Sequence, residues 1–197
     1  MESPRIFKIV VEGADGIGKI PIILKYCGES SGEQNMTVGC EFHVKTEVLD
    51  SGERVKLQLW DMENNTEFQS LYPAYFRGAS GAVICFDLAE KDTLLEASER
   101  LKIVREWMGS TPTMLIGLNP DAEDREVSHE MGREFAKEHG ITAYVEASVK
   151  NGFNIPEAFR LFSEILAFHE DSETLELSPE LKKKIKETSS RSLEDRH

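Results

Sequence analysis

The chain has 197 residues, 40% of them hydrophobic and 30% charged, with a formal net charge of −13 at pH 7. This length and composition predict one globular domain with a sizeable core. The acidic balance argues against nucleic-acid binding and against attraction to anionic lipid. Three cysteines, without a secretory signal or an apolar run of transmembrane length, favour reduced thiols in the cytoplasm. We expect a monomer.

The N-terminal segment Ile6–Ile20 combines a strand, a glycine-rich turn and the start of a helix. Ile6–Val11 is rich in β-branched and apolar residues, which indicates a buried strand. The turn Gly13–Ile20 reads GADGIGKI, and an apolar helical segment follows it. A G-x-x-x-x-G-K sequence in that context is typical of a phosphate-binding loop, because its backbone N–H groups and the helix N-terminus favour negative charge. The alternative is a strand-to-helix turn whose glycines only shape the backbone.

The remaining elements alternate between strands and helices. Two alternating runs predict a β-hairpin with Gly52 in its turn. A helix is expected from Asn154, which Glu157 would complete as a capping-box pair. The expected elements are a loop at 28–36, hairpin strands at Glu41–Leu49 and Arg54–Trp60, strands at Gly81–Leu88, Thr113–Leu118 and Ala143–Glu146, and helices around Leu94–Met108 and Ser128–Glu138. This order predicts an α/β domain with a six-stranded, mainly parallel sheet, one antiparallel hairpin edge and helices on both faces.

The domain is expected to span residues 1–169. Residues 170–197 mix charges with Ser and Thr and have almost no large apolar side chains. We therefore expect a mostly disordered tail, with at most a transient helix over Pro179–Glu187. Residue 2 is Glu2, and no cysteine lies near the C-terminus. Since myristoylation and prenylation need a glycine and a cysteine at these places, we expect no lipid anchor.

Four stretches in the expected order resemble a Rab-type small GTPase of the Ras superfamily, and the likeness covers residues 5 to about 169. They are TVGCEF (Thr37–Phe42), KLQLWD (Lys56–Asp61), YFRGASGAVICFD (Tyr75–Asp87) and EASVK (Glu146–Lys150). The resemblance implies the Ras-like P-loop NTPase fold, GTP or GDP as ligand, and a protein effector or regulator as partner. It implies nucleotide contacts at Gly13, Asp15, Gly16, Ile17, Gly18, Lys19, Ile20, Thr37, Asn64, Asp121, Ser148, Val149 and Lys150.

The Mg²⁺ site that the resemblance implies departs from the family pattern. The residue after the loop lysine, Lys19, is Ser or Thr in the family and binds the metal through its hydroxyl. Here it is Ile20, which carries no oxygen. Thr37 matches the switch I threonine, and Asp61 matches the aspartate that holds Mg²⁺ through water. Their alternatives are a strand-entry threonine and an aspartate that caps a turn, so Mg²⁺ binding stays open.

The switch II pattern Thr-Ala-Gly-Gln-Glu is replaced by Met62–Thr66, which reads MENNT. Asn64 stands at the glycine whose N–H senses the γ-phosphate. Asn65 stands at the glutamine that orients the attacking water and is one methylene shorter. Phosphoryl transfer depends almost wholly on positioning and electrostatics, so we expect little or no hydrolysis and assign no catalytic residue.

The base-recognition motif Asn-Lys-x-Asp reads Leu118–Asp121 (LNPD). Asp121 retains the carboxylate that selects guanine in the family. The alternative is that Asp121 is only a surface turn residue. Phe42, Trp60 and Tyr75 match the aromatic triad that Rab proteins present to effectors. The alternative for these three is a set of half-buried core aromatics.

These departures lead to three hypotheses. The first is a degenerate Rab-like GTPase that binds GTP or GDP weakly and serves as a protein-interaction switch, with vesicle traffic implied by the resemblance. The second is a nucleotide-free pseudo-GTPase scaffold. The third is a true GTPase with an unconventional catalytic group or a partner's arginine in trans. A lost charge-assisted contact costs about 1.5–3 kcal/mol, so two or three losses weaken the affinity by about three to five decades. Because members of the family that the chain resembles bind nucleotide very tightly, roughly micromolar binding would remain.

Overall fold

The computed structural model describes residues 3–28, 35–37, 39–63, 66–172 and 176–191. Its strands are β1 (Arg5–Gly13), β2 (Asn35–Thr37), β3 (Cys40–Val48), β4 (Arg54–Met62), β5 (Gly81–Asp87), β6 (Thr113–Leu118) and β7 (Ala143–Ala147). Its helices are α1 (Lys19–Cys27), the 3₁₀ helix η1 (Thr66–Leu71), α2 (Tyr72–Phe76), α3 (Lys91–Met108), α4 (His129–Glu138), α5 (Ile155–Asp171) and α6 (Pro179–Ser189). None of the helices in these residues is long and apolar enough to span a membrane.

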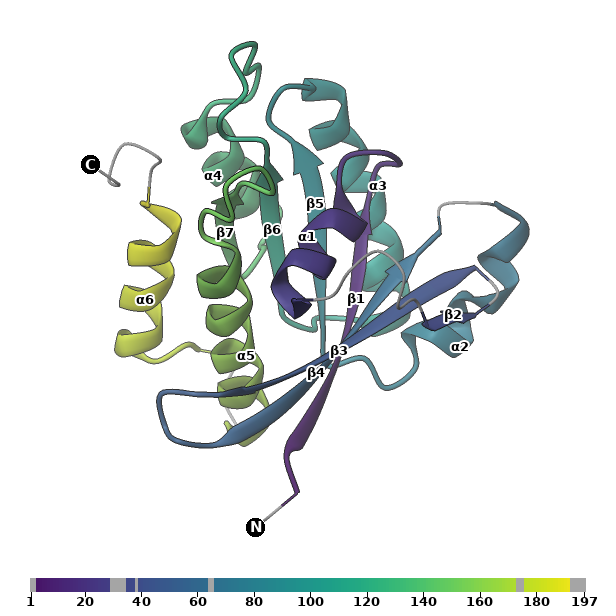
Figure 1. Ribbon diagram of the computed structural model, residues 1–197, viewed down its shortest axis with the longest axis vertical. Helices are drawn as coiled ribbons and strands as arrows, with labels where there is room; N and C mark the ends of the chain where they lie inside the picture. The colour runs from purple at the N-terminus through teal and green to yellow at the C-terminus, as the bar shows by residue number, and fades with distance from the viewer. Residues whose placement is uncertain (1–2, 29–34, 38, 64–65, 173–175, 192–197) are drawn as a thin grey trace.

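The described strands form one sheet in the order β2-β3-β4-β1-β5-β6-β7, with helices on both faces (Figure 1). β1 lies between β4 and β5 and runs parallel to both, and β6 and β7 continue the parallel part. β3 pairs antiparallel with β4 and closes the hairpin, with Gly52 at a φ of 85°. The predicted Ras-like α/β fold is confirmed. The prediction did not include the short edge strand β2, because Asn35–Thr37 is too short to show an alternation of apolar and polar side chains.

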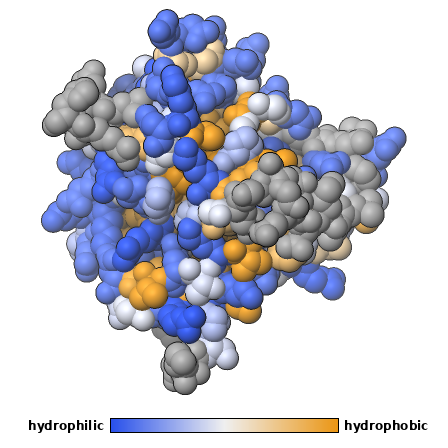
Figure 2. Space-filling view, in the orientation of Figure 1, coloured by the Kyte–Doolittle hydropathy of each residue, from blue (hydrophilic) through white to orange (hydrophobic). Residues whose placement is uncertain are grey.

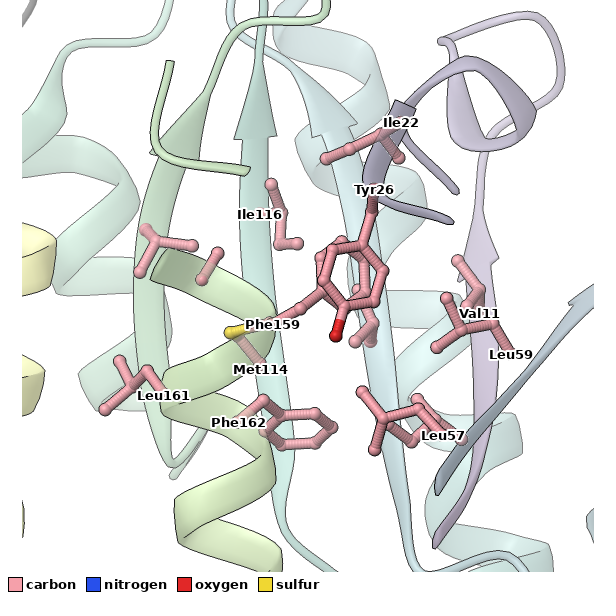
Figure 3. Packing of buried hydrophobic residues seen from close by; sticks show 14 of the residues in the cluster. Val11, Ile22, Tyr26, Leu57, Leu59, Met114, Ile116, Phe159, Leu161 and Phe162 are labelled. Atoms are coloured by element: carbon pink, nitrogen blue, oxygen red, sulfur yellow. The ribbon is translucent and has the colours of Figure 1, made fainter. Parts of the chain in front are cut away.

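Apolar side chains fill the space on both faces of the sheet. On one face, α1 and α5 cover a cluster that includes Tyr26, Phe159 and Phe162 (Figure 3). The rings of Tyr26 and Phe159 stack with centroids 4.2 Å apart. On the other face, Phe86 and Leu101 belong to the cluster under α2, α3 and α4. Burial on both faces explains why the central strands are near-continuous apolar runs.

Residues 179–189 differ from the expected disordered tail, because they form helix α6. Ser178 caps the helix by accepting a hydrogen bond from the Leu181 N–H at 3.2 Å, and Pro179 occupies the first turn. Leu181 is only 6% exposed, and Ile185, four residues later, packs against the same core cluster. These two apolar residues lie on one face of α6 and pack it against the domain. The prediction missed this contact because it used the average composition of the segment, which is polar.

The start of α5 also differs from the prediction. Asn154 has a φ of 59° and makes no side-chain cap, so the expected capping box with Glu157 is wrong. Its side-chain amide instead donates to the carbonyl oxygens of Glu146 at 3.0 Å and Thr188 at 3.2 Å. Asn154 therefore ties β7 to the end of α6.

We expect Ser178→Ala to weaken α6 locally by about 1 kcal/mol, because the cap is lost. Amide hydrogen exchange should speed up in α6 alone. Ser128→Ala is the matched control, since Ser128 caps α4 by accepting from the Met131 N–H at 3.2 Å. Faster exchange in α4 after Ser178→Ala would contradict local docking of α6.

Candidate nucleotide-binding site

The glycine-rich turn follows β1 directly and leads into α1. Gly16 and Gly18 have φ angles of 77° and 102°, in the left-handed region that side chains disfavour. Gly18 is the residue before the first turn of α1, and Lys19 begins the helix. The predicted strand, turn and helix are therefore all present. Backbone N–H groups at this helix start suit an anion.

Among the glycines of the phosphate loop, Gly13 is the one at which a side chain would have no room. A Cβ there would lie 2.5 Å from the carbonyl oxygen of Cys85 in β5 and 2.9 Å from Ile17 Cδ1, at a φ of 152°. We expect Gly13→Ala to lower the free energy of unfolding by about 1–3 kcal/mol, measured by urea denaturation. Gly16→Ala is the comparison, because a Cβ there meets nothing within 4 Å and adds only backbone strain. A smaller loss at Gly13 than at Gly16 would contradict the packing argument.

A pocket of ≈ 370 Å³ opens at the N-terminus of α1, outside the carboxyl ends of β1 and β4. Ligands of such sheets bind at this edge. The pocket is lined by Asp15, Gly16, Gly18, Lys19, Ile20, Pro21, Asp61, Met62 and Glu63. Ile17 instead belongs to the core cluster, so only its backbone remains for a ligand. The structure thus brings most of the predicted phosphate-loop residues together with Asp61.

The ammonium group of Lys19 is already engaged by the protein. Its Nζ lies 3.1 Å from Asp61 Oδ1 and donates to the carbonyl oxygen of Met62 at 3.0 Å. The Lys19 and Asp61 side chains are 8% and 9% exposed. Burial raises the pKa of Asp61, and the positive charge of Lys19 opposes that rise. A phosphate entering this pocket must therefore compete with Asp61 for Lys19.

Glu12 is a second buried carboxylate beside the phosphate loop, and it was not among the predicted site residues. It is fully buried, and neither carboxylate oxygen has a hydrogen-bond partner among the described residues. Burial raises the pKa of Glu12 to about 7, while the positive charges of Lys19 and Arg100 oppose the rise. The signal was available, because Glu12 directly follows the apolar run Ile9–Val11 near the end of β1. Its charge disfavours an anion nearby.

The described residues do not supply a Mg²⁺ site of the family type. Ile20 contributes no oxygen, and the Asp61 carboxylate is paired with Lys19. Thr37 lies in β2, but its side chain falls outside the described residues, as do Asn64 and Asn65. Among the residues described, no group of three or more His, Cys, Asp and Glu side chains is placed to hold a metal ion.

The predicted base-recognition residues lie at the carboxyl ends of β6 and β7. The Asp121 carboxylate is 3.5 Å from Lys150 Nζ, which is exposed. Ser148 is buried and its N–H donates to the Phe153 carbonyl oxygen at 3.0 Å. The Val149 carbonyl oxygen accepts from Lys25 Nζ of α1 at 2.7 Å. The structure thus connects the two base loops with each other and with the helix of the phosphate loop.

The two altered positions of the base motif, Leu118 and Asn119, make contacts within the protein. Leu118 is fully buried in the core. Asn119 has a φ of 57°, and its side-chain amide donates to Asp87 Oδ2 at 2.7 Å. Asn119 therefore links the ends of β5 and β6.

The three aromatic residues of the predicted effector face form one continuous patch. The Phe42 and Trp60 ring centroids are 5.5 Å apart, and those of Trp60 and Tyr75 are 5.9 Å apart. All three side chains are half-buried. Lys8 Nζ lies 4.2 Å from the centroid of the Trp60 ring. The geometry agrees with a shared surface, and effector binding there remains a prediction.

The sheet order, the glycine turn before α1 and the pocket at the strand ends define a P-loop domain of the Ras type. The Ras family model matches residues 8–167, so the chain belongs to the Ras family of small GTPases. It is similar to Ras-related protein Rab-17 of Homo sapiens, with 33% identity over 175 residues that cover 87% of this chain and 81% of the relative. Members of this family bind guanine nucleotides and recognise effector or regulator proteins.

Proposed function

We propose that this chain is an atypical Rab-like protein that binds GDP and GTP weakly, hydrolyses GTP little or not at all, and acts through a protein partner. The observation that carries the proposal is the phosphate pocket, which is formed but has its lysine paired with Asp61 at 3.1 Å. The glycine turn and Lys19 support phosphate binding. The ion pair between Lys19 and Asp61 supports weak binding, because Lys19 must leave Asp61 or contact both Asp61 and the phosphate when a nucleotide binds.

Guanine selection in this proposal rests on Asp121, whose carboxylate would accept two N–H groups of the base. The Nζ atom of Lys150 lies 3.5 Å from that carboxylate, and the lysine side chain is exposed. Leu118 supplies no amide to steady the loop. Each missing charge-assisted contact costs about 1.5–3 kcal/mol. Two or three missing contacts would reduce the tight nucleotide binding of the family to roughly micromolar affinity.

Poor hydrolysis follows from the residue types in switch II. Asn65 is a methylene shorter than the glutamine that orients water in relatives of this type, and Asn64 replaces a glycine. Chemistry that depends on positioning tolerates neither change. The patch of Phe42, Trp60 and Tyr75 would then serve as the partner surface, and the Rab resemblance suggests vesicle traffic as its setting.

The second candidate is a nucleotide-free scaffold of the same fold. The buried, unpaired Glu12 beside Lys19 and Asp61 favours it, because two carboxylates already surround the only lysine lining the pocket in the described part of the chain. In this case the patch would be presented in one fixed conformation.

A thermal-shift titration with GDP, GTP and ATP, each with Mg²⁺ and with EDTA, distinguishes the two candidates. A nucleotide that binds only the folded state stabilises it by about 2.7 kcal/mol at one hundred times its Kd. We expect a rise in Tm with GDP and GTP but not ATP, and no effect of EDTA. Asp121→Asn should remove the preference for guanine. No shift with millimolar GDP or GTP would favour the scaffold.

A further inference from the structure

A second groove lies between α4 and α6, with β7 as its floor, and it shares no lining residue with the nucleotide pocket. Its volume is ≈ 760 Å³. In Figure 1, α6 stands beside α5 and β7 at the edge of the sheet farthest from β2. The groove exists because α6 docks there, since Lys182, Ile185, Lys186 and Ser189 of α6 form one wall.

The α6 wall is anchored to the domain by contacts at its C-terminal end and near its middle. Ser189 Oγ donates to the Tyr144 carbonyl oxygen, and the Thr188 carbonyl accepts from the Asn154 amide at 3.2 Å. Lys184 Nζ pairs with Glu164 of α5 at 2.7 Å and with Asp50 at 2.8 Å. The groove is therefore a built feature of the fold.

The charge of the groove is opposite to that of the whole chain. Six Lys and Arg side chains line it, against one glutamate, in a chain of net charge −13. The glutamate is Glu146, which is buried and already accepts two hydrogen bonds from Arg125, at 2.6 and 3.1 Å. In Figure 2, the surface where α6 lies is mostly hydrophilic. Three of the other lining cations pair with carboxylates that lie outside the lining, namely Arg133 with Glu130, Lys182 with Glu176 and Arg191 with Glu157. The unopposed positive charge of the groove therefore comes from its two remaining lysines, Lys137 and Lys186.

Two of these cations stand on opposite walls and are not neutralised. The ammonium groups of Lys137 of α4 and Lys186 of α6 make no ion pair or hydrogen bond within the described part of the chain. Between the walls, Ile141 and Ile185 contribute apolar surface and pack against the core clusters. An occupant that matches this pattern has carboxylates on two sides and an apolar side chain between them.

We propose that this groove binds an acidic, partly apolar segment of a partner protein. A groove of ≈ 760 Å³ with helices on two sides fits a peptide segment better than a flat surface. An anionic membrane or a nucleic acid would also be repelled by the remaining negative charge of the chain. In this proposal Lys137 and Lys186 form ion pairs with carboxylates of the partner segment. Ile141 and Ile185 contact an apolar side chain of that segment.

The test uses the full chain and a fluorescently labelled peptide that alternates glutamate and leucine, measured by anisotropy. We expect binding that weakens with added salt. A matching lysine–leucine peptide is attracted by the acidic chain as a whole, so its binding should not be weakened by the groove variants. Lys137→Glu and Lys186→Glu should each weaken binding by about tenfold or more. Lys183→Glu is the matched control, because Lys183 is on the same helix but outside the groove. It should change the affinity less than about twofold, since its exposed charge is screened.

Several results would overturn the proposal. They are absence of peptide binding, an equal loss with Lys183→Glu, or stronger binding to vesicles of anionic lipid that the same two variants abolish. Self-association in sedimentation that Lys186→Glu disrupts would assign the groove to a second copy of the chain. The variants Lys137→Ala and Lys186→Ala give the same readout if charge reversal unfolds α4 or α6.

Discussion

Replacing Glu12 by leucine is expected to raise the free energy of unfolding at pH 8 by on the order of 3 kcal/mol. Glu12 is fully buried without a hydrogen-bond partner for either oxygen among the described residues, and burial raises its pKa from 4.5 to about 7. Leucine has a similar volume and removes a buried charge. Urea denaturation at several pH values measures the effect.

The pH dependence of the unmodified protein gives the sign of the effect. Below pH 4.5 the Glu12 carboxyl is protonated in the folded and unfolded chains alike. Between pH 4.5 and about 7 the unfolded chain releases the proton while the folded chain keeps it, so this group makes stability fall as the pH rises. Above pH 7 the destabilisation is complete.

Two variants separate charge from packing at this position. Glu12→Gln keeps the shape and cannot titrate, so it should remove the pH slope but gain less stability than leucine, because its amide stays unsatisfied. If Glu12→Leu leaves both the stability and the slope unchanged, then Glu12 is not buried and unpaired in solution.

The fold was predictable because each central element has a clear local pattern. β1, β5 and β6 are short apolar runs covered on both faces, and the hairpin alternates around Gly52. α6 was not predictable in the same way. Its docking depends on Leu181 and Ile185 meeting a core that is assembled from residues far away in the sequence.

The sequence names candidate site residues but not their mutual contacts. Gly16, Gly18, Lys19 and Asp61 were all predicted, and the structure places them around one pocket, while their binding of nucleotide stays a prediction. The ion pair between Lys19 and Asp61 depends on β1 and β4 being neighbours, which no local pattern shows. Likewise, Asn119 reaches Asp87 only because β5 and β6 pair.

Replacing Ile20 by serine is expected to increase the affinity for GDP in the presence of Mg²⁺ by about 10- to 100-fold. Ile20 lines the phosphate pocket directly after Lys19, and a serine there returns the hydroxyl that relatives of this type use for the metal. One recovered contact to a charged group contributes about 1.5–3 kcal/mol, and about 1.4 kcal/mol corresponds to tenfold in Kd. Titration with a fluorescent GDP analogue measures the change.

EDTA and two further variants determine whether the gain comes from the metal. The unmodified protein should bind GDP equally well with Mg²⁺ and with EDTA, whereas Ile20→Ser should lose its gain in EDTA. Ile20→Ala opens the same space without supplying an oxygen, so it should stay as insensitive to EDTA as the unmodified protein. Adding Asp61→Asn to Ile20→Ser should reduce the gain, because the metal needs a carboxylate on the opposite wall of the pocket. An equal gain in Ile20→Ala would mean that Ile20 obstructs the phosphates by its bulk, and that the missing oxygen is not what limits nucleotide affinity.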